Sequence, residues 1–198
     1  MNIHSQINGY LDVTLGPMFS GKTTYLVAVY DKYTKSEIPV GIVNHSFDNR
    51  YSSNECISTH NLLQRSCVQC TNICDVWDYE NIDNLVKQPL YTCKVILIDE
   101  GQFYTDIVCG VLDMLKHGKH VYVCGLDGDF NRQIFGDILR LIPLCDKVRK
   151  LNSICGICKT NPAIFSHRIT ANQEQIGVGG ETEYVPACRI CYDGKNNK

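Results

Sequence analysis

The sequence has no excess of positive charge, no long apolar run and no internal repeat. Its 198 residues carry 19 lysines and arginines against 21 aspartates and glutamates, so it lacks the basic surface that binds a nucleic-acid backbone. No apolar segment approaches the roughly 20 residues that cross a bilayer, and the first residues show no signal-peptide pattern. We therefore expect a cytoplasmic protein without nucleic-acid or membrane partners.

The cysteine content is high, with 12 in the chain, but it does not indicate a disulfide framework. The chain is long for a disulfide-stabilised domain, and its cysteines are scattered through core-like segments. A reducing compartment is expected. Five thiols stand in apolar or mixed surroundings and are interpreted as small structural hydrophobes: Cys56, Cys93, Cys109, Cys124 and Cys145.

Short, β-branched apolar runs bounded by turn residues predict buried strands. These runs are residues 10–15, 40–43, 95–98 and 121–126, and a last strand is expected over 147–151. Because helical patterns alternate with these runs, the sequence predicts an α/β fold in which helices cover a parallel sheet.

The helical patterns lie at residues 23–35 and 105–116, and Gly118 is the expected end of the second. A third helix is predicted over residues 136–141, ending at Pro143. Residues 75–87 are compatible with a short helix. Paired cysteines, glycines and short alternating runs replace helical periodicity towards the C-terminus, so we predict two domains, residues 1–151 and 152–198.

The segment between the first strand and the first helix reads as a Walker A phosphate loop. It consists of Gly16, Pro17, Met18, Phe19, Ser20, Gly21, Lys22 and Thr23. Glycines let the backbone turn its N–H groups towards phosphate oxygens, and the following helix adds its positive end. Lys22 would reach the outer phosphates, and the Thr23 hydroxyl could bind Mg²⁺.

Two carboxylates, Asp99 and Glu100, follow the apolar strand at residues 95–98. Ligands of such sheets gather at the carboxyl ends of strands, so Asp99 is predicted to hold Mg²⁺. Glu100 could accept a proton from water, as in an ATPase, or from an alcohol, as in a kinase. Alternatively, the pair only begins a solvated turn.

Two C-x-x-C pairs have the spacing of a tetrahedral zinc site. Their members are Cys155, Cys158, Cys188 and Cys191. Four thiolates leave no open position on the metal, so the predicted zinc is structural. A further group, Cys67, Cys70 and Cys74, has no evident fourth ligand, and no second metal is predicted.

The loop between the two cysteine pairs contains a glycine-rich stretch, residues 175–180, followed by Tyr184. Glycines let the main chain approach a ligand closely, so such a loop could read the edge of a planar base while the aromatic ring packs against it. Without further context, a flexible glycine-rich hairpin would be the favoured interpretation.

Four features together closely resemble the type II thymidine kinases: GPMFSGKT at residues 16–23, DEGQF at 99–103, LDGDF at 126–130 and the cysteine pairs. The resemblance spans most of the chain. It implies a RecA-like P-loop core, a zinc-ribbon-like domain carrying a lasso loop, and a homotetramer. It also implies transfer of the γ-phosphate of ATP to the 5′-hydroxyl of thymidine, with Glu100 as the base and dTTP as a feedback inhibitor.

The resemblance also implies site residues beyond the phosphate loop. On the ATP side they are Asp48, Asn49, Arg50, Asp99, Gly101 and Gln102. Around thymidine they are Met18, Phe103, Leu126, Phe130, Phe135, Gln175, Ile176, Gly177, Val178, Gly179 and Tyr184. Arg168 is a further candidate for a phosphate contact. Asp129 and Tyr104 depart from the residues common in the family. From the residues alone, an ATPase or nucleotide switch with a zinc-anchored partner-binding loop remains an alternative.

Overall fold

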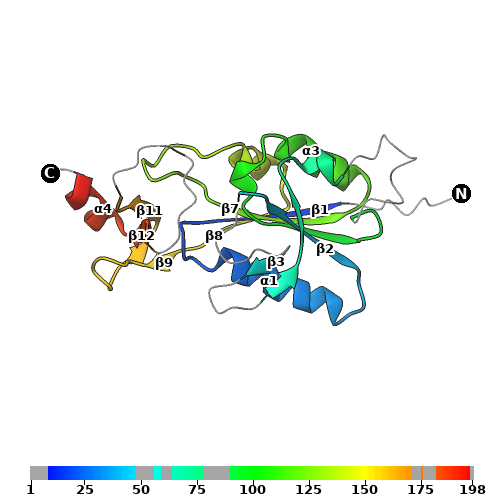
Figure 1. Ribbon diagram of the computed structural model, residues 1–198, viewed down its shortest axis with the longest axis horizontal. Helices are drawn as coiled ribbons and strands as arrows, with labels where there is room; N and C mark the ends of the chain where they lie inside the picture. The colour runs from blue at the N-terminus through cyan, green and yellow to red at the C-terminus, as the bar shows by residue number, and fades with distance from the viewer. Residues whose placement is uncertain are drawn as a thin grey trace, which may run out of the picture.

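The computed structural model describes residues 9–47, 56–58, 64–77, 90–170, 175 and 182–196. Its centre is a six-stranded sheet in the order β5-β2-β6-β7-β1-β8, in which all neighbouring strands are parallel (Figure 1). The strands are β1 (Tyr10–Leu15), β2 (Val40–His45), β5 (Val68–Cys70), β6 (Val95–Ile98), β7 (His120–Gly125) and β8 (Lys147–Lys150). Because the six strands are parallel, their carboxyl ends lie at the same edge of the sheet. Strands that are distant in the sequence, such as β2 and β6, are neighbours there.

Helices cover both faces of this sheet, as Figure 1 shows. On one face α1 (Lys22–Thr34) places Leu26 in the buried cluster that holds Leu97 of β6. On the other, α3 (Ile107–Lys116) packs Val111 in the cluster that holds Ile96. Adjacent residues of β6 thus enter opposite cores, which explains its uninterrupted apolar sequence. The predicted α/β fold is confirmed.

The third predicted helix differs from the expectation. Residues 138–144 form a 3-10 helix, η3 (Ile138–Leu144), which contains Pro143 instead of ending there. Proline lacks the N–H of the α-helical ladder and its ring clashes with the preceding turn, whereas a short 3-10 segment tolerates the loss of one bond. The helix considered at residues 75–87 is described only at its start, where η1 (Ile73–Asp75) is also a 3-10 helix.

The remaining elements are short. A small antiparallel pair, β3 (Cys56–Ser58) with β4 (Gln64–Ser66), precedes β5, and η2 (Gly101–Phe103) follows β6. After the sheet come β9 (Ser153–Ile154), β10 (Pro162–Ala163), β11 (Phe165–Arg168), β12 (Tyr184–Ala187) and α4 (Arg189–Asn196). They gather at one end of the molecule (Figure 1). The domain boundary at residue 151 stays a prediction.

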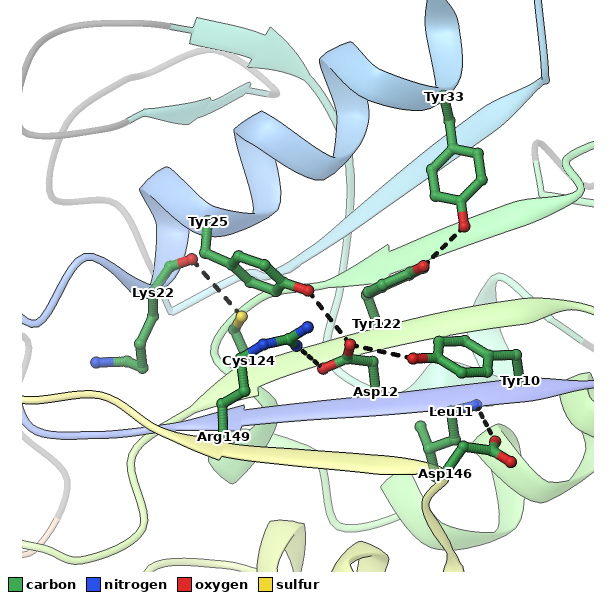
Figure 2. A network of polar contacts seen from close by, with 10 residues as sticks. All are labelled: Tyr10, Leu11, Asp12, Lys22, Tyr25, Tyr33, Tyr122, Cys124, Asp146 and Arg149. Atoms are coloured by element: carbon green, nitrogen blue, oxygen red, sulfur yellow. Dashed lines mark hydrogen bonds and ion pairs between the residues drawn. The ribbon is translucent and has the colours of Figure 1, made fainter. Parts of the chain in front are cut away.

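A buried carboxylate ties α1 to the sheet near the phosphate loop (Figure 2). Asp12 of β1 is 1% exposed and forms an ion pair with Arg149 of β8. The Tyr25 hydroxyl donates to Asp12 at 3.3 Å, and the Arg149 guanidinium lies 4.6 Å from the Tyr25 ring centroid. Burial, and next the nearby Asp12 charge, raise the pKa of Tyr25, which remains a protonated donor. This network, together with the Cys124 thiol 3.6 Å from the Lys22 carbonyl oxygen, fixes the first turn of α1.

Candidate active site

The predicted phosphate loop connects β1 to α1, and so lies between a strand and a helix as a Walker A loop does. Gly21, the residue before the helix, has φ = 84°, a left-handed conformation that favours glycine. The Lys22 side chain is largely buried and its Nζ donates to the Pro17 carbonyl oxygen at 2.8 Å. The lysine therefore curls back over its own loop, where phosphate oxygens would be contacted.

The end of β6 lies beside this loop. Asp99 is 3% exposed, and its Oδ2 accepts a hydrogen bond from the Thr23 hydroxyl at 2.8 Å. Residues 76 positions apart thus supply two oxygen donors at one place. Hard oxygen donors suit Mg²⁺, so this pair fits the predicted ion.

Glu100, the next residue, has an unusual backbone. Its φ is 52° and its ψ is 39°, in the left-handed region that non-glycine residues rarely adopt. Its N–H donates to Asp99 Oδ1 at 2.9 Å, and its carboxylate accepts a hydrogen bond from the Gln102 amide. The left-handed backbone alone does not distinguish Glu100, because the exposed Glu37 also has a positive φ of 57°, but Glu100 lies directly beside the buried Asp99 and is therefore a candidate for a functional role.

An apolar cluster assembles from three segments that are distant in sequence. Met18 of the phosphate loop, Phe130 of the loop after β7 and Tyr184 of β12 pack together. Leu126 and Phe19 lie against them. The structure therefore brings together four of the residues expected around the nucleoside: Met18, Leu126, Phe130 and Tyr184.

A second aromatic group follows Glu100. The rings of Phe103 and Phe135 meet edge-on, with centroids 5.5 Å apart. Phe103 also packs near His45, at 5.4 Å, and Phe47, at 6.2 Å. His45 and Phe47 had no distinguishing signal in the sequence, because a lone histidine or phenylalanine at the end of a strand is usually a core or surface residue.

Arg168 lies with the apolar cluster. Its guanidinium is 4.0 Å from the Phe130 ring centroid and donates to the Tyr184 hydroxyl. Its predicted phosphate contact stays a prediction. Ser166, which sequence analysis missed, accepts a hydrogen bond from the Met18 N–H at 3.0 Å and so joins β11 to the phosphate loop. A single serine in a short strand carries no recognisable motif.

The two loop segments expected at the substrates are described only in part. Gln175 donates from Nε2 to Asp129 Oδ2 at 2.8 Å. Its predicted companions lie outside the described residues: Ile176, Gly177, Val178 and Gly179. The same holds for Asp48, Asn49 and Arg50.

The four cysteines of the C-x-x-C pairs converge as predicted. The sulfurs of Cys155, Cys158, Cys188 and Cys191 all lie within 4.8 Å of one another. In the part of the chain that the structure describes, this is the one group of three or more potential ligands found this close together. The arrangement is compatible with a tetrahedral zinc site.

Backbone donors favour thiolates in this cluster. Burial would raise the pKa of Cys155, but N–H groups, including that of Cys188 at 3.3 Å, outweigh it and hold this pKa below the usual range. The hydrogen bond with the Cys188 thiol instead raises the pKa of Cys191. The N–H groups of Asn161 and Thr160 also lower the pKa of Cys158, so some protons leave readily while that of Cys191 resists, and a bound cation removes this resistance.

Among the thiols interpreted as structural, Cys93 and Cys124 are buried and Cys145 is partly buried. Cys109 is exposed on α3, so its interpretation as a small structural hydrophobe is wrong. The buried positions of that helix are Ile107, Gly110, Val111 and Met114, and position 109 falls on its outer side.

A phosphate loop after β1, a buried acid at the end of β6 and a parallel sheet between helices define a P-loop nucleotide-binding protein of the α/β class. Comparison of the sequence with protein families narrows this class. The thymidine kinase family matches residues 9–192. The chain belongs to that family.

Individual relatives agree with this assignment. The thymidine kinase of sheeppox virus (strain KS-1) is 38% identical over 93% of this chain and 97% of the viral protein. The cytosolic thymidine kinase of Bos taurus is 37% identical over 95% of this chain and 74% of the bovine protein. Thymidine kinase 1 of Dictyostelium discoideum is 33% identical over 99% of this chain and 83% of that protein.

Proposed function

We propose that this protein transfers the γ-phosphate of ATP to the 5′-hydroxyl of thymidine, producing thymidine monophosphate for nucleotide salvage. Membership of the thymidine kinase family supports the reaction. The observation that carries the mechanism is the position of Glu100, which directly follows the Asp99–Thr23 pair and is hydrogen-bonded within the same turn.

The phosphate side of the site would be formed by the loop from Gly16 to Thr23. Its N–H groups and Lys22 bind and orient the phosphates of ATP, and Thr23 and Asp99 would hold Mg²⁺. When bound, that ion supplies positive charge that neutralises the transferring phosphoryl group. Asp48, Asn49 and Arg50 are proposed to complete this side, together with Gly101.

The acceptor side would be the apolar cluster of Met18, Phe130 and Tyr184, flanked by Leu126 and by the Phe103–Phe135 pair. An aromatic-lined pocket suits a planar pyrimidine and excludes water from the reacting atoms. We further propose that the main chain of residues 175–179 reads the edge of the base, so that a wrong base leaves buried polar groups unpaired.

Glu100 would act as the general base. It accepts the proton of the 5′-hydroxyl as that oxygen attacks the γ-phosphorus in line with the departing ADP, so the bond to the bridging oxygen breaks as the new P–O bond forms. No covalent enzyme intermediate is required.

The other expected properties are proposals as well. Zinc at the four cysteines would be structural, because all four tetrahedral positions are taken by thiolates. Cytoplasmic location, a homotetramer and feedback inhibition by dTTP are proposed from the resemblance to type II enzymes. Among the described residues, no helix is long and apolar enough to cross a membrane.

Replacing the base tests the proposal. In Glu100→Gln, formation of thymidine monophosphate should fall by about a hundredfold or more, while ATP and thymidine still bind, because a neutral amide cannot accept the proton. Product and ADP are measured with and without thymidine.

Glu37→Gln, an exposed position after α1, serves as the control and should leave turnover unchanged. Normal turnover of Glu100→Gln would place the base elsewhere. Equal ADP release with and without thymidine in the unmodified protein would make it an ATPase instead.

A further inference from the structure

The side chain of Gln102 connects the proposed base to Leu126, which flanks the apolar cluster proposed to bind the nucleoside. It lies in η2 and is 3% exposed. Its Nε2 donates to Glu100 Oε2 at 2.6 Å, and its Oε1 accepts the N–H of Leu126 at 2.9 Å. One amide group therefore contacts both the carboxylate after β6 and the backbone after β7.

The orientation of this amide follows from its two partners. The backbone N–H of Leu126 can only donate, so the oxygen of Gln102 must face it. The nitrogen then faces Glu100, where an ionised carboxylate can only accept. A flipped amide would set donor against donor and acceptor against acceptor, so the network itself selects one arrangement.

The surroundings leave this side chain little freedom. A Cβ atom at Gly125 would lie 2.5 Å from Gln102 Oε1, and one at Gly136 would lie 2.0 Å from the Gln102 carbonyl oxygen. Both distances are too short for a real contact, so glycine at these two positions permits the close packing of Gln102. The amide is thus fixed by packing as well as by hydrogen bonds.

We infer that Gln102 is a positioning residue: it orients the Glu100 carboxylate and couples it to the wall of the nucleoside pocket at Leu126. The inference rests on the proposed function of Glu100. A hydrogen bond to an ionised acceptor is among the stronger ones, which suits a residue that must hold a base on a strained, left-handed backbone.

The consequence is a link between substrate binding and the base. A nucleoside that packs against Leu126 also presses on the segment whose N–H is bonded to Gln102. The position of the carboxylate then depends on the filling of the pocket. Catalysis is sensitive to such placement, since a shift of about 1 Å in a reacting group can cost about a hundredfold in rate.

Two replacements of Gln102 separate orientation from packing. Gln102→Met keeps the length and apolar contacts but removes both hydrogen bonds. Gln102→Glu keeps the shape but replaces the donor that faces Glu100 Oε2 with a carboxylate oxygen, an acceptor against an acceptor. In both, kcat should fall by about ten- to a hundredfold, while KM for ATP changes less than about twofold. Gln69→Met on β5 is the control for the same replacement away from the site.

A double variant gives the decisive result. If Gln102 acts through Glu100, then Glu100→Gln combined with Gln102→Met should lose no more kcat than Glu100→Gln alone, because the group to be oriented is already gone. Additive losses, or normal kcat in both single Gln102 variants, would overturn the inference.

The two proposals fail in distinguishable ways. Normal turnover in Glu100→Gln refutes the base, whereas a large loss there with additive behaviour refutes only the positioning role. Thermal unfolding of each variant shows whether a loss of turnover reflects a loss of folded protein. A folded Gln102→Glu protein with lowered kcat supports the inference even if Gln102→Met fails to fold.

Discussion

The parallel sheet and the segment from β9 to α4 are held together in different ways. The four residues of β6 are all fully buried between helices on both faces. In the second region, β9 and β10 have two residues each, and Ile154 is 69% exposed. Its small buried cluster consists of Cys155, Ala163 and Cys188. Apolar burial can hold the sheet, whereas the second region has little of it, and we propose that a metal bound by the four cysteines cross-links this region.

The segment from β9 to α4 is also bonded to the loop that follows β7. The Tyr192 hydroxyl donates to the Phe130 carbonyl oxygen at 2.5 Å, and Arg132 pairs with Asp193 at 3.0 Å. The apolar cluster of the site draws residues from both regions. Loss of the cysteine anchor should therefore affect the nucleoside side more than the phosphate side.

The largest expected effect on the difference between the two regions is that of removing the proposed zinc. In Cys188→Ser, thymidine-dependent turnover should be lost while the sheet remains folded, because structural zinc contributes about 10–16 kcal/mol in small peptides. Metal content and hydrogen exchange check this, with protection lost over residues 153–168 and 184–194 but kept in β6 and β7.

Cys145→Ser, a partly buried thiol outside the cluster, is the matched control and should keep both zinc and activity. A zinc-free Cys188→Ser protein with full exchange protection of the C-terminal region would show that this region needs no cross-link.

Truncating one apolar side chain in each region tests whether the sheet depends on apolar burial more than the segment from β9 to α4 does. Leu97→Ala, at a fully buried position of β6, should reduce the free energy of unfolding by about 2–5 kcal/mol. Ile154→Ala should change it by less than about 0.5 kcal/mol, since that side chain is largely exposed. Urea denaturation measures both. Comparable losses would mean that the C-terminal region also relies on apolar packing.

A smaller loss than that of Leu97→Ala is expected in the polar network beneath α1. Arg149→Met leaves the Asp12 carboxylate buried without its cation, and should lower the free energy of unfolding by about 1–3 kcal/mol. Arg140→Met is the paired control, because its ion pair with Asp137 is exposed and should contribute almost nothing. Equal losses of stability in Arg149→Met and Arg140→Met, measured by thermal unfolding, would show that the burial of Asp12 does not strengthen its ion pair.

The sequence predicted features that depend on neighbouring residues. The strands at residues 10–15 and 95–98, the phosphate loop and the convergence of the cysteine pairs follow from local pattern and spacing. The Asp12–Arg149 pair and the Ser166 contact could not be predicted, because their partners meet only after distant segments pack. The helix predicted over residues 136–141 was wrong in type and in its end, because residues 138–144 form a 3-10 helix that contains Pro143, a residue that cannot donate to an α-helical ladder.

The position of β1 within the sheet has a consequence for biosynthesis. This first strand pairs with β7 on one side and β8 on the other. A ribosome must therefore translate through Lys150 before β1 gains both neighbours, although the phosphate loop is among the earliest segments made. Nascent chains should acquire ATP affinity late and abruptly, and until then the exposed edges of β1 make them clients for chaperones.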